Sequence, residues 1–317
     1  MEAKAIVMPA AGQVEVRRVT LKPLGADDVL IRTSLTSISA GTERMLFSGI
    51  MPHPMLQFPV VPGYETVGTV IEAGSNAGEW LGKRVYVGGN YGFVGVNSAF
   101  GGQSALIVAP ASHLTDLGSL NDEQGVLLAL AATALHGVEV AGCHLGEASC
   151  ASRQVLILGQ GIVGQLAARF AKVCGATVHV TDKAEVRLRF AVADSIVPAD
   201  PPPPDPGVYD VLIDATGKMD AIAPRLMSLK QGGRVVLLGY YDRIDLPYMP
   251  AFLRELTFAV SKEWAAGDLA RARDAIAHGL VDVSGLITHR LPADEAPRAF
   301  DLAFNDPECL KMVLVWE

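Results

Sequence analysis

The sequence lacks an excess of positive charge and lacks any long uninterrupted apolar run. Its 317 residues carry a formal net charge of −8, which argues against a broad phosphate-binding surface and therefore against a nucleic-acid partner. The most apolar stretch, residues 125–142, contains His136 and Glu139. It is too short and too interrupted to span a bilayer, so we expect a buried helix and no transmembrane segment. The start of the chain also lacks a basic segment followed by an apolar one, and we expect a cytoplasmic protein.

Cysteine is scarce as well. The four cysteines are Cys143, Cys150, Cys174 and Cys309, and no two of them form a C-x-x-C pair. His144 beside Cys143 is weak evidence for a metal site. We therefore expect four free thiols in a reducing compartment and no bound metal in this segment.

The sequence shows two different patterns of predicted secondary structure, one before Gly125 and one after it. Residues 1 to about 124 contain short strand-like runs separated by turn signals, which predicts a small all-β barrel or sandwich. From Gly125 onward, continuous apolar runs alternate with helical patterns, which indicates a parallel sheet covered on both faces. The proline-rich stretch 199–207 is predicted to be a rigid loop between two of these strands, because proline removes backbone donors.

The segment VLILGQGIVG predicts a dinucleotide site. It places Gly159, Gly161 and Gly164 in G-x-G-x-x-G spacing, after an apolar strand and before an amphipathic helix. The first glycine permits a tight turn, the second lets a pyrophosphate approach the backbone, and the third lets helix and strand pack closely. The helix begins near Ile162 and Val163, and its first N–H groups would face the phosphates.

Three further positions follow the ends of the next strands. Asp182 ends the next strand, where a carboxylate accepts both ribose hydroxyls and repels a 2′-phosphate. This favours NAD over NADP, although the nearby Lys183 and Arg187 make the preference less than absolute. Thr216 and Gly239 end the following two strands, at the edge where such sheets bind ligands. The alternative for the whole segment is a tight βαβ turn without a ligand.

The motifs GYETVGTV, LGKRVYV, ATALHG, GQGIVG and LITHRLPADEAPRAFDL make the chain resemble the medium-chain dehydrogenase/reductase superfamily over essentially its whole length. The resemblance implies an α/β protein with a GroES-like β-rich catalytic domain, residues 1–124 and 263–317. It also implies a Rossmann NAD-binding domain with a doubly wound parallel sheet, residues 125–262. Members often dimerise through the last Rossmann strand, which here falls near residues 256–261, so the resemblance favours a homodimer.

Zinc-dependent members of this superfamily hold a catalytic metal with a cysteine, a histidine and a later cysteine or glutamate. Here Ser39 stands in the cysteine position and Tyr64 in the histidine position, while the third region offers only alanines. Neutral hydroxyl groups are poor zinc ligands. The chain therefore looks like a zinc-free member with no metal, and the resemblance places Tyr64 at the reaction site.

A narrower resemblance, to the bacteriochlorophyllide a dehydrogenase family, rests on SISAGTERMLFSGIMP followed by FPVVPGYE. It implies that a hydroxyethyl group on a bulky apolar macrocycle is oxidised to an acetyl group in bacteriochlorophyll synthesis. The segment 45–58, with three methionines and two phenylalanines, would suit an adaptable lip for such a ligand. A satellite core under a long loop is the alternative.

Oxidation of an alcohol without a metal requires a hydroxyl group that holds the substrate oxygen and a route for its proton. We predict that Tyr64 holds the oxygen, either as a base or as a neutral donor that passes the proton along Ser39 or Thr42. Glu65 and His136 are candidate relay ends. The alternatives are a structural salt bridge for Glu65, a hydrogen-bonded helix histidine for His136, and turn-stabilising roles for the two smaller hydroxyls.

Other assignments stay open from the sequence. Thr133 matches a family position near the nicotinamide, with mid-helix packing as the alternative. A zinc-free quinone or enone reductase is a rival function, but such enzymes usually favour NADPH, against which Asp182 argues. A dinucleotide-binding protein without catalytic activity is a second rival, and the polar Tyr64 counts against it.

Overall fold

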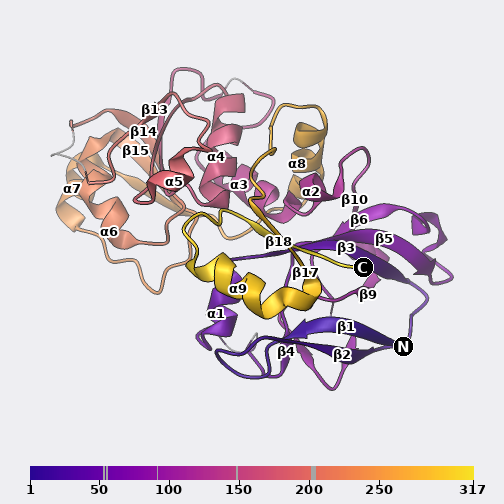
Figure 1. Cartoon of the computed structure of the whole chain (residues 1–317). Helices are drawn as coiled ribbons and strands as arrows, with labels where there is room; N and C mark the ends of the chain where they lie inside the picture. The colour runs from indigo at the N-terminus through magenta and orange to yellow at the C-terminus, as the bar shows by residue number, and fades with distance from the viewer. Residues whose placement is uncertain (53, 55, 91, 148, 201–204) are drawn as a thin grey trace. The chain divides into compact units, whose positions relative to one another are not determined.

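The computed structural model describes residues 1–52, 54, 56–90, 92–147, 149–200 and 205–317. The chain divides into two compact units: residues 1–129 with 286–317 form unit 1, and residues 130–285 form unit 2 (Figure 1). The sequence placed the domain limits at 124/125 and 262/263. The second limit differs because α8 (Asp268–Ala277) is joined to unit 2, where Arg271 pairs with Glu139.

Unit 1 is built mainly from short strands. They are β1 (Glu2–Val7), β2 (Glu15–Leu21), β3 (Asp28–Ile38), β4 (Val60–Val61), β5 (Thr66–Ala73), β6 (Arg84–Val87), β7 (Phe93–Val94), β8 (Asn97–Ser98), β9 (Leu106–Pro110), β10 (Leu114–Asp116), β17 (His289–Pro292) and β18 (Met312–Val315). The largest sheet has the order β10-β6-β5-β3-β18-β17, and β9 also pairs with β3. Smaller sheets join β1-β2-β7 and β4-β8. This confirms the β-rich architecture predicted for the first part of the chain.

The long strand β3 organises unit 1. It pairs with β5, β9 and β18, all antiparallel to it. Its register shifts between Thr33 and Leu35, where it meets β5, and such irregularities bend a strand and re-aim its side chains. The carboxyl end of β3 leads directly to Ser39 and to α1 (Thr42–Phe47).

Short helices complete unit 1. They are α1, α2 (Asp122–Gly125), α9 (Ala296–Asn305) and the 3-10 turns η1 (Gly78–Trp80), η2 (Ala111–His113) and η4 (Ala293–Glu295). Helices α1 and α9 lie side by side (Figure 1). They contact each other through Phe47 and Phe304, whose ring centroids are 5.5 Å apart. Both helices pack on one apolar core that includes Leu46 and Phe300.

Unit 2 is a parallel sheet with helices. The strands are β11 (Gln154–Leu158), β12 (Thr177–Thr181), β13 (Ser195–Ile196), β14 (Tyr209–Asp214), β15 (Leu229–Leu237) and β16 (Thr257–Val260). Their spatial order β13-β12-β11-β14-β15-β16 is the order of the Rossmann fold. Strands such as β11 are buried along nearly their whole length, as expected for a sheet covered on both faces. The predicted fold class is therefore confirmed.

The remaining elements of unit 2 are mostly helical. They are α4 (Ile162–Val173), α5 (Glu185–Leu188), α6 (Met219–Ile222), η3 (Ala223–Ser228), α7 (Tyr248–Arg254) and α8; the apolar helix α3 (Leu128–Val140) begins at the end of unit 1 and continues into unit 2. Among the described residues, no helix is long and apolar enough to cross a membrane. Of the proline-rich stretch, residues 201–204 lie outside the described part.

The prediction of four free thiols is wrong for two of them. Cys143 and Cys150 form a disulfide, while Cys174 and Cys309 are free and buried. The turn after α3 brings the Cα atoms of the bonded pair to 5.1 Å, a separation that a disulfide requires. Thiol content therefore no longer supports a reducing compartment for this chain.

Candidate active site

The predicted glycine turn lies between β11 and α4. Gly159 has φ +85°, and a Cβ on Gly164 would lie 1.9 Å from the carbonyl oxygen of Gly159. Both positions therefore require glycine for the protein's own geometry. Gly161 differs, because a Cβ there would meet no atom within 4 Å. The space above Gly161 is open at the start of α4, where a pyrophosphate would bind.

The other predicted cofactor residues lie at the same edge of the sheet. Leu158, at the end of β11, is in register with Thr181 of β12 and with Asp214 of β14. Asp182 follows β12 directly, Thr216 lies two residues after the end of β14, and Gly239 lies two residues after the end of β15. Ile162 and Val163 begin α4, whose N-cap Gly161 makes no side-chain cap. The N–H groups of the first turn are thus available to phosphate oxygens.

Asp182 is also part of the glycine turn itself. Its Oδ2 accepts the N–H of Gln160 at 2.6 Å, and its Oδ1 accepts the N–H of Ala184 at 2.7 Å. A guanidinium nitrogen of Arg187 lies 3.9 Å away. The carboxylate therefore fixes the turn and leaves its remaining lone pairs for a ribose.

Thr133 and His136 both lie on α3. A Cβ on Gly137 would lie 2.8 Å from a methyl carbon of Leu238, so this face of α3 packs against the end of β15. Thr133 is one turn earlier on the same face. The Nδ1 atom of His136 lies 3.4 Å from an oxygen of the buried Asp268. That pairing favours the structural alternative for His136, and its relay role stays a prediction.

The predicted hydroxyl groups meet in unit 1. Tyr64 lies in the turn before β5, and its hydroxyl is 2.9 Å from the Oγ of Ser39, which follows β3. Thr42, at the start of α1, also hydrogen-bonds to the Tyr64 hydroxyl. The ring is held by Phe100, with centroids 5.1 Å apart. Three of the five predicted catalytic residues therefore form one hydrogen-bonded cluster.

The electrostatic surroundings keep Tyr64 neutral. Burial, and secondarily the negative charge of Glu65, raise the pKa of the Tyr64 phenol well above its usual value. A phenol with a raised pKa is a poor base at neutral pH but remains a good hydrogen-bond donor. Of the two roles predicted for Tyr64, the environment favours the neutral donor.

Glu65 forms a buried ion pair. Its Oε2 lies 2.5 Å from the Nζ of Lys311, and both side chains are almost completely buried. The hydroxyl of Ser37 also donates a hydrogen bond to Glu65, and the ammonium group of Lys311 donates one to the carbonyl oxygen of Ile38 at 3.1 Å. This arrangement favours the structural alternative for Glu65.

Sequence reasoning missed one acidic side chain, Glu43, and one amide side chain, Gln103, next to this cluster. Glu43 is completely buried, and its Oε2 accepts the N–H of Ser39 at 2.6 Å. Gln103 donates from Nε2 to the other oxygen of Glu43 at 3.3 Å. Glu43 belongs to the quoted segment SISAGTE and could have been recognised there. Lys311 carried no such signal, because its role depends on a contact between distant segments.

The side chains in this cluster do not suit a zinc ion. Ser39 and Tyr64 are neutral and hydrogen-bonded to each other, and the raised pKa of Tyr64 opposes phenolate formation. Glu65 is already paired with the ammonium group of Lys311. Among the described residues, no group of three or more histidine, cysteine, aspartate or glutamate side chains is placed to hold a metal ion.

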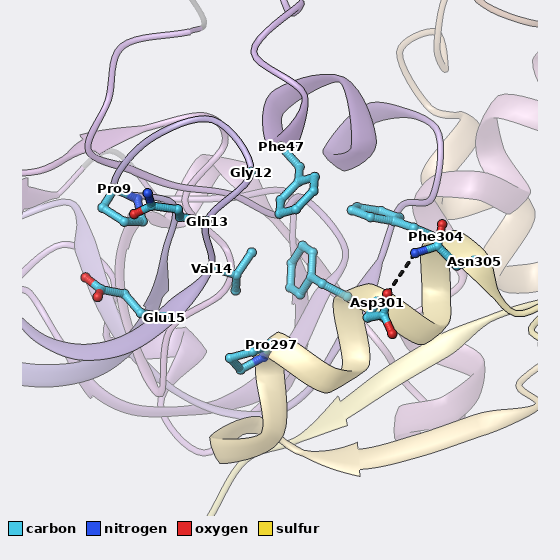
Figure 2. Close-up of a pocket in the computed structure, with 11 residues that line it drawn as sticks. Pro9, Gly12, Gln13, Val14, Glu15, Phe47, Pro297, Asp301, Phe304 and Asn305 are labelled. Carbon is cyan, nitrogen blue, oxygen red and sulfur yellow. Dashed lines mark hydrogen bonds between the residues drawn. The ribbon is translucent and has the colours of Figure 1, made fainter.

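A separate cavity of about 390 Å³ lies between the loop at residues 9–15, the end of α1 and helix α9 (Figure 2). Phe47, Phe300 and Phe304 form its apolar wall, while Glu15 and Asp301 add carboxylates. None of the predicted catalytic residues lines it.

The segment 45–58, predicted as a lip for a large ligand, mostly packs inward. Leu46 and Met51 are buried in the core of unit 1, and Met45, Phe47, Leu56 and Phe58 pack against that core. His53 and Met55 lie outside the described residues. The contacts favour the satellite-core alternative, and the lip stays a prediction.

Residues 25–119 match the family model for the alcohol dehydrogenase GroES-like domain. Among solved structures, a dehydrogenase from Sinorhizobium meliloti 1021 with NADP bound is 25% identical, with a TM-score of 0.83 and 99% of each chain covered. L-idonate 5-dehydrogenase from Escherichia coli has a TM-score of 0.87 at 19% identity, covering 100% of this chain and 99% of its own. The second likeness supports the fold alone.

Two curated relatives match the whole chain. The 2-desacetyl-2-hydroxyethyl bacteriochlorophyllide A dehydrogenase of Rhodobacter capsulatus is 34% identical, covering 100% of this chain and 99% of the relative. The corresponding protein of Cereibacter sphaeroides is 33% identical with the same coverage. The chain thus belongs to the family of 2-desacetyl-2-hydroxyethyl bacteriochlorophyllide A dehydrogenases, within the dinucleotide-dependent medium-chain alcohol dehydrogenases that carry a GroES-like domain.

Proposed function

We propose that this protein oxidises the secondary alcohol of a hydroxyethyl group on a bacteriochlorophyllide-type macrocycle to an acetyl group, with NAD as the hydride acceptor and without zinc. Two relatives with that substrate in their names match the full length of the chain. The observation that carries the chemistry is the pair of Tyr64 and Ser39, whose hydroxyl oxygens are 2.9 Å apart.

In this proposal unit 1 supplies the hydroxyl groups. Tyr64, kept neutral by its surroundings, donates a hydrogen bond to the substrate oxygen and stabilises negative charge as it develops there. The hydroxyl proton of the substrate passes to the oxygen of Ser39 or Thr42, both of which hydrogen-bond to Tyr64, and that residue releases its own proton to solvent water. The nicotinamide, when bound, accepts the hydride.

Unit 2 supplies the cofactor site. The open space at Gly161 and the uncapped start of α4 fit a pyrophosphate. We propose NAD over NADP because the carboxylate of Asp182 would repel a 2′-phosphate. Thr133, Thr216 and Gly239 are proposed to surround the nicotinamide half.

An absorption experiment tests the function. Incubating the protein with NAD and a hydroxyethyl chlorin should shift the long-wavelength absorption band, because the new acetyl group joins the conjugated system. NADH should form in equal amount. A quinone or enone reductase, or a non-catalytic dinucleotide-binding protein, would leave the chlorin band where it was, and that result would overturn the proposal.

We also propose a homodimer that forms at the edge strand β16. Val260 in this strand is 67% exposed, and the neighbouring helix α7 exposes Tyr248, Met249, Phe252 and Leu253. An unpaired strand edge beside such an apolar surface requires cover. Light scattering should give a dimer at micromolar concentration, and Val260→Lys should shift it toward monomer. A monomeric wild-type protein would contradict this proposal.

A cytoplasmic location remains part of the proposal. It is supported by the dependence on a nicotinamide cofactor, whose pool is available in that compartment. Cell fractionation should find the protein with cytoplasmic dehydrogenase activity, and recovery from an extracytoplasmic fraction would contradict it.

A further inference from the structure

The buried acid Glu43 has no part in the mechanism above, although it lies next to the proposed hydroxyl pair. It is completely buried on α1. One carboxyl oxygen accepts the N–H of Ser39 at 2.6 Å, and the other accepts a hydrogen from Gln103 at 3.3 Å. Glu43 therefore fixes the backbone of the residue whose hydroxyl meets Tyr64.

Among the described residues, no cation forms an ion pair with Glu43. The charged groups that act on it are Glu65, from the turn before β5, and Lys311, next to β18, while Tyr64 is the neighbouring titratable group. Lys311 is already paired with Glu65 at 2.5 Å. An ionised Glu43 would thus add a second buried negative charge without compensation, which is strongly unfavourable.

We propose that Glu43 is a positioning residue that acts as a neutral acid. In this form Oε2 still accepts the N–H of Ser39 and so holds Ser39 against Tyr64, while the proton lies on Oε1 in place of the 3.3 Å hydrogen bond from Gln103. The region under the substrate oxygen then carries no uncompensated negative charge. The inference rests on the proposed function, because oxidation of an alcohol places developing negative charge on that oxygen.

Electrostatic coupling between Glu43 and Tyr64 supports the inference. Burial, and among the charges Glu65, raise the pKa of Glu43 to about 8. An ionised Glu43 in turn raises the pKa of Tyr64. The charge of Glu43 therefore influences the Tyr64 hydroxyl, the group proposed to hold the substrate oxygen. That charge changes within an experimentally accessible pH range.

A purely structural role for Glu43 would give a different pH dependence of activity in its variants. The bond from the Ser39 N–H to Glu43 closes the turn before α1, whose N-cap Gly41 makes no side-chain cap. If this were its whole function, any substitution that keeps the bond would have the same relative activity at every pH. A role for charge predicts a pH-dependent ratio instead.

Infrared difference spectroscopy first tests the protonation state without reference to activity. The wild-type protein should show the carbonyl stretch of a buried protonated carboxyl that disappears as the pH rises through about 8. Glu43→Gln should lack this band. Glu79→Gln, which alters an exposed glutamate of the same unit, should retain it. Absence of the band in the wild type would overturn the inference.

Kinetics then tests the role. Glu43→Gln, which keeps a neutral acceptor, should retain near-native kcat at pH 7, whereas Glu43→Ala should lose about 10- to 100-fold through misplacement of Ser39. The ratio of kcat for Glu43→Gln to kcat for wild type should rise by up to about tenfold per pH unit once Glu43 ionises. The corresponding ratio for Glu79→Gln should stay near one at each pH.

The two tests separate the present inference from the proposed function. A wild-type protein that forms no acetyl product contradicts the proposed function, whatever the infrared result. An active wild-type protein with the infrared band but a pH-independent ratio shows that Glu43 only closes the turn, and this contradicts the inference.

Discussion

The two units build their sites from different materials. In unit 2 the proposed pyrophosphate site is made of backbone: a turn at positive φ, an open position at Gly161 and the uncapped start of α4. In unit 1 the proposed reaction site is made of side chains that are far apart in the sequence, Ser39 and Tyr64, and a buried ion pair of Glu65 and Lys311 lies beside it. Backbone sites depend on residues that are close in sequence, whereas side-chain networks depend on the tertiary fold.

The difference also sets what each site tolerates. A backbone site fails when a side chain fills it. The buried network of unit 1 holds two carboxyl groups and one ammonium group, so each member determines the charge of the others. A substitution in one of these sites should therefore leave the other site unchanged.

The largest expected effect is at Gly164. Gly164→Val places a side chain against the carbonyl oxygen of Gly159, 1.9 Å from the new Cβ, and should abolish binding of NAD(H). Gly161→Ala is the matched variant, because its Cβ meets no protein atom. It should keep the fold by circular dichroism and lose cofactor affinity only. NADH fluorescence titration measures the affinity of both variants, and unchanged affinity in Gly164→Val would refute this account of the turn.

The second effect is at Tyr64. Tyr64→Phe removes one hydroxyl, and kcat should fall by about 10² to 10⁴-fold, the usual contribution of such a group. NAD binding should be unchanged, because the cofactor residues are in unit 2. Tyr248→Phe, which removes an exposed hydroxyl, should have native kcat. Near-native turnover in Tyr64→Phe would make Tyr64 a packing residue and move the proton route to Ser39, Thr42 or water.

The third effect is on stability. Lys311→Met leaves Glu65 as an unpaired buried charge, and the free energy of unfolding should fall by about 3–5 kcal/mol. Adding Glu65→Gln should recover part of that loss. Lys4→Met breaks a pair with Asp294 that is exposed on both sides and should cost about 0–1 kcal/mol. Urea unfolding distinguishes the cases, and equal losses for Lys311→Met and Lys4→Met would contradict a buried ion pair.

The comparison explains what the sequence could predict. The glycine spacing, the strand that precedes it and the acid at Asp182 are local signals, and all are found at one sheet edge in the structure. Tyr64, Ser39 and Thr42 were also identified, but through family resemblance. Lys311 and Gln103 were not, because a buried cation or amide is recognised only by its distant partners. The disulfide between Cys143 and Cys150 depends likewise on how the turn folds.

The compact units divide the chain at 129/130 and 285/286, later than the predicted domain limits, for the same reason. The sequence ended the Rossmann part after β16, where the strand pattern ends. Helix α8 joins unit 2 through Arg271, which hydrogen-bonds to Glu139 on α3 at 2.8 Å. That contact connects segments more than a hundred residues apart, so it could not be predicted from the local sequence pattern.

The fourth effect is the pH dependence of stability. The pKa of Glu43 is raised from 4.5 to about 8 in the folded protein, so the folded state binds the proton more tightly than the unfolded state. The stability contribution is complete below about pH 4.5 and is lost as the pH rises through about 8. The slope should approach about 1.4 kcal/mol per pH unit within this window. Glu43→Gln should flatten it, and an equal slope in both proteins would refute the assignment.

The smallest effect concerns cofactor choice. Asp182→Asn removes the charge that opposes a 2′-phosphate and keeps the size of the side chain. Charges a few ångströms apart near a surface interact by about 1–4 kcal/mol, so the affinity ratio of NADP(H) to NAD(H) should rise at least about fivefold. The amide oxygen can replace only one of the two acceptors that now bind the N–H groups of Gln160 and Ala184. We therefore also expect somewhat weaker binding of both cofactors. Asp220→Asn, at an exposed position of the same unit, should leave the ratio unchanged. If the ratio stays constant in Asp182→Asn, the preference is set by the turn that Asp182 holds in place and not by its charge, and the cofactor site would then be specified by backbone alone.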